Sequence, residues 1–192
     1  MSKNKNSMAW SLFDRYLIQG LNGMALGLFS TLIIGLIIKQ ISGIFTGGIA
    51  TFLLTVAIVA MSLTGPVIGI GVANALKSPK LVILASGVTG LLGAFGGTFS
   101  SGALLSDKMQ LVLPGAGDPL GAFIAVVISA EIGRLVSGKT KIDIIVTPLV
   151  TIVTGGMVAY FVGPYLAMAM ANLGEFIRVS TELQPFLMGI AV

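Results

Sequence analysis

The stretch LIQGLNGMALGLFSTLIIGLII, Leu17–Ile38, contains no charged side chain. A bilayer crossing needs about 20 apolar residues, and a helix of this length measures roughly 33 Å. The stretch is too long for the core of a signal peptide, and Lys39-Gln40 follows where a cleavage site would need small residues. The sequence therefore predicts a retained transmembrane helix, and this prediction decides the fold class.

The composition agrees with a membrane protein. Of 192 residues, 55% are apolar and only 9% are charged, and the mean hydropathy is +1.03. A soluble domain carries about 25% charged residues, so this supply cannot cover the surface of a water-soluble globule. Cysteine and histidine are both absent. Their absence excludes disulfides, thiolate or imidazole metal sites and a Ser-His-Asp triad, and we expect no metal and no cofactor.

Further charge-free stretches predict an all-α bundle of five membrane spans. In the N-terminal segment, residues 1–16, Met8, Leu12, Phe13 and Tyr16 recur at helical spacing, and Trp10 and Tyr16 are candidate interface anchors, which predicts an amphipathic helix on the membrane surface. Residues 17–184 form the membrane domain, and residues 185–192 are expected to begin a truncated sixth span. After Leu17–Ile38, the predicted spans are Ile49–Val72, Leu81–Leu105, Pro119–Ser137 and Ile144–Met168.

The basic residues predict the orientation. The net charge of +4 comes from residues scattered singly and in pairs, which indicates membrane topology and no binding of nucleic acid. In the five-span layout one side carries eight Lys and Arg residues and the other carries three, so we expect a cytoplasmic N-terminus. The richer side has Lys3, Lys5, Arg15, Lys77, Lys80, Arg134, Lys139 and Lys141, and the poorer side has Lys39, Lys108 and Arg178.

Small residues recur at a spacing of four along the chain. In lipid, such pairs let two helix backbones approach closely, which predicts helix packing within one chain or, alternatively, a dimer interface. The predicted third span is the richest, with four glycines in one register. The residues concerned are Gly23/Gly27, Gly43/Gly47, Gly65/Gly69, Gly93/Gly97 and Gly117/Gly121, and in the third span Gly87, Gly90, Gly93 and Gly96.

Two features within the spans are candidates for substrate binding. Gly65-Pro66 interrupts the second span, and a broken helix exposes polar backbone groups of the kind that transporters use to hold substrates; a simple kink is the alternative. Asn74 follows in the same segment. Glu131 and Arg134 are three residues apart, so they share a helix face and can pair. Such intramembrane charges mark functional sites, although Arg134 could equally reach the headgroups with Glu131 as its counter-ion.

The segment SDKMQLVLPGAGDP, Ser106–Pro119, is too short to cross the bilayer and contains Pro114. We expect a re-entrant or interfacial loop that is buried against protein, because lipid does not tolerate irregular backbone. Its end, Gly115 to Asp118, matches the G-x-G-D string of intramembrane aspartyl proteases, which need two neighbouring carboxylates. Asp107 is the nearest upstream aspartate and lies in a polar loop. Asp118 followed by proline is better explained as a helix N-cap, and it is also a candidate substrate contact.

Four blocks of the sequence resemble the EIIC membrane domain of bacterial phosphotransferase-system sugar transporters, in the group where EIIC is a separate chain. They are GPVIGIGVANALKSPKL (65–81), GDPLGAFIAVVISAE (117–131), SGKTKIDIIVTPLVTI (137–152) and TELQPFLMGI (181–190). The resemblance implies a homodimeric carrier in the bacterial inner membrane. It would move a sugar that a separate EIIB protein phosphorylates, and it would transfer no phosphoryl group itself.

Chains of this family are about twice as long, so the resemblance covers an N-terminal half. In related groups the sugar site lies largely in the later half, which leaves a second possibility, a membrane scaffold or regulator that does not transport. An intramembrane protease built on Asp118 is the third. If this half contacts the substrate, the candidates are Gly65, Pro66, Asn74, Asp118, Glu131 and Arg134.

Overall fold

The computed structural model describes residues 10–183. Within this range the regular secondary structure is helical, apart from one isolated antiparallel bridge between Leu105 and Leu111. The predicted all-α class is confirmed. Three described helices are long and apolar enough to cross a membrane, and there are four if a pair of helices that meet at a bend counts as one span.

The first helix is continuous from Trp10 to Ser42. It comprises η1 (Asp14–Gln19), α2 (Gly20–Leu28), η2 (Phe29–Ile33) and α3 (Ile34–Ser42), where η1 and η2 are wider π-helical turns. The predicted boundary between residues 16 and 17 does not interrupt it, because neither proline nor a capping side chain stops the helix there. Its 33 residues measure about 50 Å, so both ends extend past a hydrocarbon core of about 30 Å.

The second crossing is bent, as the sequence predicted. Helices α4 (Gly48–Ser62) and α5 (Thr64–Ala75) meet at an angle of 46°. The predicted third span is shorter than expected, because α6 (Lys80–Ala94) ends after 15 residues and a separate short helix, α7 (Gly96–Ser100), follows it. The predicted count of five spans is therefore not confirmed.

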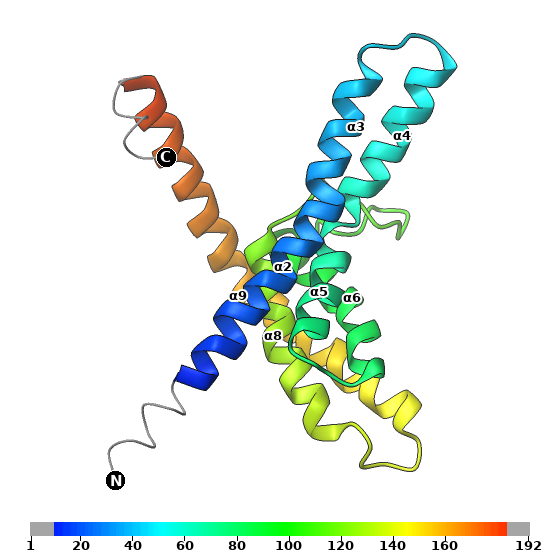
Figure 1. Cartoon of the computed structure of the whole chain (residues 1–192), viewed down its shortest axis with the longest axis vertical. Helices are drawn as coiled ribbons and strands as arrows, with labels where there is room; N and C mark the ends of the chain where they lie inside the picture. The colour runs from blue at the N-terminus through cyan, green and yellow to red at the C-terminus, as the bar shows by residue number, and fades with distance from the viewer. Residues whose placement is uncertain (1–9, 184–192) are drawn as a thin grey trace.

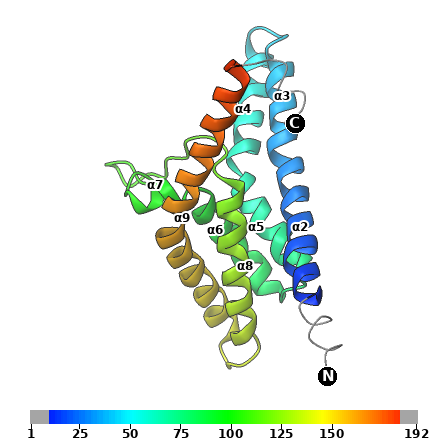
Figure 2. The same cartoon turned by 90° about the vertical axis from the view of Figure 1, so that its left-hand side faces the viewer.

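The last two helices differ greatly in length. Helix α8 (Pro119–Val136) has 18 residues, whereas α9 (Asp143–Leu183) has 41 and contains Pro148 and Pro164. Helix α9 joins the predicted fifth span to the polar stretch after it without a break, and Figure 2 shows that α9 is bent near its middle. Proline is the usual cause of such bends, since it removes a backbone donor and clashes with the preceding turn.

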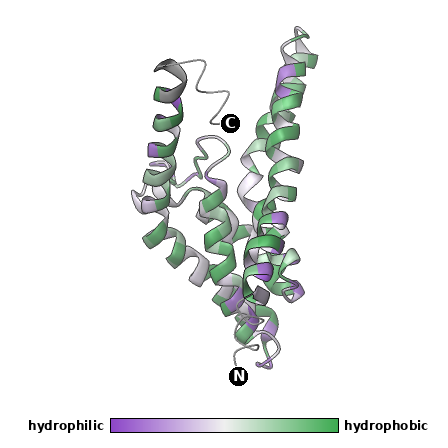
Figure 3. Ribbon diagram, turned by 60° about the vertical axis from the view of Figure 1, so that its left-hand side comes forward, coloured by the Kyte–Doolittle hydropathy of each residue, from purple (hydrophilic) through white to green (hydrophobic). Residues whose placement is uncertain are grey.

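The helices form two kinds of region (Figure 1). The basal bundle consists of α2, α5, α6, α8 and the first half of α9, which pack against one another. Two arms project from it: the α3–α4 hairpin and the C-terminal half of α9. The arms are largely apolar on their surfaces, while hydrophilic side chains gather near the N-terminal end of the bundle (Figure 3).

Glycines let the backbones of the basal bundle approach closely. A Cβ at Gly23 would lie 2.5 Å from the carbonyl oxygen of Gly71, and one at Gly93 would lie 2.5 Å from that of Gly121. A Cβ at Gly65 would likewise meet the carbonyl oxygen of Gly90, and one at Gly69 would meet that of Ser86. The predicted packing within the chain is confirmed for these positions. Gly43 and Gly47 are exceptions, because they lie at the turn between α3 and α4, where Gly47 adopts a φ of +73°.

Candidate functional site

Three charged side chains from two helices meet at the N-terminal end of the basal bundle. Arg15 Nη2 donates to Glu131 Oε1 at 2.7 Å, and Arg134 Nη1 donates to the same oxygen at 3.0 Å. All three side chains are about one-third exposed, at 30%, 31% and 32%. The predicted pairing of Glu131 with Arg134 is confirmed, and one carboxylate faces two guanidinium groups.

Local backbone geometry explains how these side chains meet. Glu131 and Arg134 are three residues apart on α8 and therefore share a face. Arg15 lies in η1, whose wider turn also brings Gln19 Nε2 within 2.7 Å of Asp14 Oδ2. Arg15 Nη2 in addition reaches the carbonyl oxygen of Leu76 at 3.4 Å, just after α5. The cluster thus connects the first helix, α8 and the α5–α6 turn.

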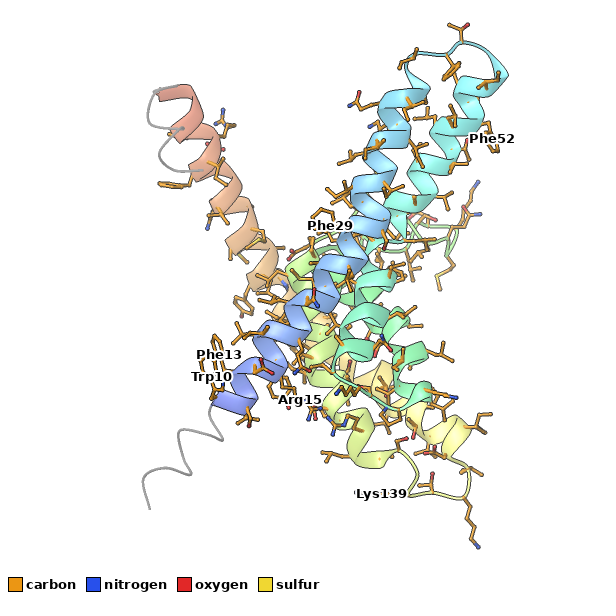
Figure 4. All side chains as sticks on the ribbon, in the orientation of Figure 1. Trp10, Phe13, Arg15, Phe29, Phe52 and Lys139 are labelled. Carbon is orange, nitrogen blue, oxygen red and sulfur yellow. The ribbon has the colours of Figure 1, made fainter. Side chains whose placement is uncertain are left out.

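A pocket of about 330 Å³ lies beside the cluster. We name it the basic pocket, and its lining residues are Arg15, Gln19, Leu76, Lys77 and Arg134. In Figure 4, Arg15 points from the first helix toward the neighbouring helices, whereas Lys139 extends away from the bundle. Trp10 and Phe13 lie nearby on the same helix, and their rings stack at 5.6 Å.

Sequence reasoning did not connect Arg15 with Glu131. The signal was present, because the predicted topology places the start of the first span and the end of the span containing Glu131 on the same side. Charge pairing across 116 residues cannot be read from spacing alone. The same topology also places Lys77 at this end.

The helix break at Gly65-Pro66 is tightly packed. Gly65 is buried, and a Cβ there would lie 2.8 Å from the carbonyl oxygen of Gly90. Pro66 occupies the first turn of α5, where its missing N–H leaves no helical hydrogen bond unmade. The amide of Val67 donates to the carbonyl of Leu63 at 3.0 Å and continues the chain across the bend. These contacts describe a packed bend at the start of α5. Glu131 belongs to a different helix, α8.

Asn74 is the penultimate residue of α5, directly before the α5–α6 turn, and is exposed. Its backbone carbonyl accepts a hydrogen bond from the amide of Lys77 at 2.9 Å, which helps to end α5. Lys77 itself adopts a φ of +55°, a left-handed conformation usually occupied by glycine at this position after a helix. The basic pocket thus includes a lysine where the backbone favours glycine.

Asp118 is the N-cap of α8. Its Oδ1 accepts a hydrogen bond from the amide of Leu120 at 2.9 Å, and Pro119 takes the first helical position. The predicted cap is therefore confirmed. Asp107 is exposed in the tight turn closed by the Met109 amide and the Ser106 carbonyl. Neither observation favours the G-x-G-D protease interpretation.

The segment between α7 and α8 is irregular, as predicted, but most of it is not buried against the described chain. Met109 is 78% exposed and Leu111 is 50% exposed, whereas Leu104 is buried. The backbone forms a small hairpin here, in which the Val112 amide donates to the Leu104 carbonyl at 2.9 Å. The expected burial was wrong for these side chains because the hairpin satisfies its own backbone groups and needs little cover from the helices.

The acidic residues of the described chain do not form a metal-binding group. Among residues 10–183, no three acidic side chains come together as a metal site, and the chain contains no histidine or cysteine. The basic pocket instead combines guanidinium, ammonium and amide donors, which suit an anion.

Comparison with known proteins identifies the family. The family model described as "Phosphotransferase system, EIIC" matches residues 18–192, which include every helix of the basal bundle. No curated protein and no solved structure is significantly similar to the chain. The helical membrane architecture agrees with the sequence match. The chain belongs to the EIIC family of the phosphotransferase system.

Proposed function

We propose that this protein is the membrane permease subunit of a phosphotransferase-system sugar transporter and that a separate EIIB protein phosphorylates the sugar during uptake. The family match over residues 18–192 carries the proposal, since EIIC domains are the transport components of this system. The apolar helices supply the membrane-spanning scaffold that such a subunit requires.

The distribution of charge supports an orientation for the proposal. The basic end of the bundle, with Arg15, Lys77 and Arg134, faces the cytoplasm if the majority of basic residues lies inside. This end would then face EIIB, whose phosphoryl group is anionic. The N-terminus would be cytoplasmic, and the membrane would be the bacterial inner membrane.

The six candidate residues receive different roles in this proposal. Gly65, Pro66 and Asp118 act through helix packing and capping, as their contacts support. Glu131, Arg134 and Asn74 lie toward the basic end, where the sugar would leave. We therefore expect the sugar to reach these three residues on the exit side and not in a closed central cavity.

The test is sugar uptake in a bacterial strain that lacks its own sugar transporters. The strain would express this chain with the soluble proteins of a phosphotransferase system, with and without an EIIB subunit, and would be offered a panel of labelled sugars. We expect one sugar to accumulate as its phosphate only when both proteins are present. If no sugar accumulates with either combination while the protein is inserted normally, the scaffold alternative replaces the transport proposal.

We also propose a homodimer, as in the family. The two arms expose long apolar side chains, including Phe52 on α4 at 66% and Phe176 on α9 at 70%. Such surfaces contact either lipid or a second subunit. Crosslinking of single cysteines placed at Phe52 in native membranes would yield a dimer band if α4 faces its copy. If crosslinking at positions along both arms gives only monomers, the homodimer is rejected.

A further inference from the structure

We propose that the basic pocket binds the phosphate group of an anionic ligand, either the headgroup of an acidic phospholipid or a soluble phosphate ester. The inference concerns the binding of a phosphate group and not of the sugar itself, although Arg134 is also one of the residues that the sugar is expected to reach. Its test measures ligand binding, so it can fail while sugar transport is demonstrated. It rests on the charge, the donors and the position of the pocket.

The charge of the pocket is unbalanced. Arg15, Lys77 and Arg134 supply three positive charges, and the single carboxylate of Glu131 pairs with the two arginines. Among the described residues, no acid forms an ion pair with Lys77. Asp14 is the other carboxylate near this end of the first helix, and it accepts a hydrogen bond from Gln19. Even with both acids counted, the group keeps an excess of positive charge.

Arg15 also has an unused hydrogen-bond donor. Arg15 Nε is one of two buried side-chain atoms in the described chain that have no hydrogen-bond partner. A buried donor without an acceptor is destabilising, so such a group calls for a functional or structural reason. A phosphate oxygen is a suitable acceptor for guanidinium and ammonium groups, and arginine binds phosphate with parallel hydrogen bonds.

Two uncommon backbone conformations occur around the pocket, a π-helical turn and a non-glycine residue with positive φ. Arg15 and Gln19 both lie in η1, and π-helical turns often occur at functional sites. Lys77 is one of two non-glycine residues with positive φ in the described chain. The C-terminal ends of α5 and α8 meet here, and their dipoles favour cations, but this effect accounts for neither the positive φ of Lys77 nor the void between the cations.

The position of the pocket is consistent with the level of lipid headgroups. The stacked Trp10 and Phe13 lie on the same helix, less than two turns before Arg15, and are 66% and 46% exposed. Aromatic side chains of this kind gather at the membrane–water interface. A headgroup phosphate and a soluble phosphate ester could both reach the pocket from that level.

Lys77→Gly is a sharp test because glycine adopts the observed φ of +55° without strain. The substitution removes a charge and should leave the melting temperature unchanged or higher. Lys139→Gln removes a charge at the same end of the molecule but outside the pocket and serves as the matched control. The full-length protein, purified in neutral detergent, would be examined by native mass spectrometry with added phosphatidylglycerol or phosphatidylcholine.

We expect the wild-type protein to retain phosphatidylglycerol in preference to phosphatidylcholine, with about fivefold weaker retention in Lys77→Gly and no change in Lys139→Gln. In the second arm, inorganic phosphate and a hexose phosphate replace the lipid. Binding that depends on Lys77 only in this arm identifies a soluble ligand. If neither arm depends on Lys77 in folded protein, or if the two lipids bind equally and phosphate does not bind, the proposal is overturned.

Discussion

The basal bundle and the two arms are built from similarly apolar residues but are stabilised in different ways. In the bundle, backbones approach closely at glycines, and side chains such as Ile68, Val72 and Val126 are completely buried. In the arms, large apolar side chains face outward and glycines such as Gly174 have open space around them. Apolar character alone therefore does not define a core in a membrane protein. Small residues at the helix contacts define it.

The largest expected difference is in the labelling rate of cysteines placed at Lys139 and at Met109, which reports their access to water. The chain has no cysteine, so single cysteines can be introduced without a background. A membrane-impermeant maleimide should label a cysteine at Lys139 at least about tenfold faster than one at Met109 if the hairpin before α8 dips into the membrane. Labelling from each side of the membrane would be measured, with Ile44, at the tip of the α3–α4 arm, as an accessible reference. Rapid labelling at Met109 would remove the re-entrant interpretation.

The same glycine-to-alanine change should have opposite signs in the two regions. At Gly69 the added Cβ would collide with the carbonyl oxygen of Ser86, so Gly69→Ala should destabilise the protein by about 1–3 kcal/mol. At Gly174 the space is open, and alanine should stabilise α9 by about 0.5–1 kcal/mol. Thermal unfolding in detergent measures both variants. Equal effects would contradict the distinction between bundle and arm.

Breaking an ion pair should also cost more stability in the basal bundle than in the α9 arm. Glu131→Gln leaves Arg15 and Arg134 without their carboxylate in a partly buried site and should destabilise by about 1–2 kcal/mol. Glu175→Gln breaks the exposed pair with Arg178 on the α9 arm and should leave the melting temperature almost unchanged. A double-mutant cycle between Arg15 and Glu131 checks that the loss belongs to the pair, and additive effects would show that it does not.

A smaller loss of stability than at Glu131 is expected at the start of α8. Asp118→Ala removes the N-cap and should destabilise the protein by about 1 kcal/mol, whereas Asp118→Asn keeps an accepting oxygen and should be nearly neutral. Unfolding measurements would compare the two variants. Loss of a proteolytic product with unchanged stability would instead revive the protease alternative.

The sequence predicted the helical class, the bend at Gly65-Pro66, the cap at Asp118 and the pair Glu131–Arg134, because each depends on local spacing or on a single residue type. It did not predict the continuity of the first helix or the early end of α6. The first helix is continuous because no proline or capping side chain interrupts it, a local signal that the prediction did not use. The early end of α6 depends on how the following residues pack, as between α7 and α9. The contact of Arg15 with Glu131 required the three-dimensional arrangement, although the topology pointed to it.

The bend of α9 has a mechanical consequence. Gly163 lies against Gly96 of α7, and Pro164 lacks the amide that would bond to the carbonyl of Tyr160. The helix can therefore flex at this point without breaking that hydrogen bond, and the C-terminal arm would rotate about the contact with α7. A small change of angle at this contact would produce a larger displacement at the end of the arm. Distances between spin labels on α8 and the arm should narrow in distribution when Pro164 is replaced by alanine.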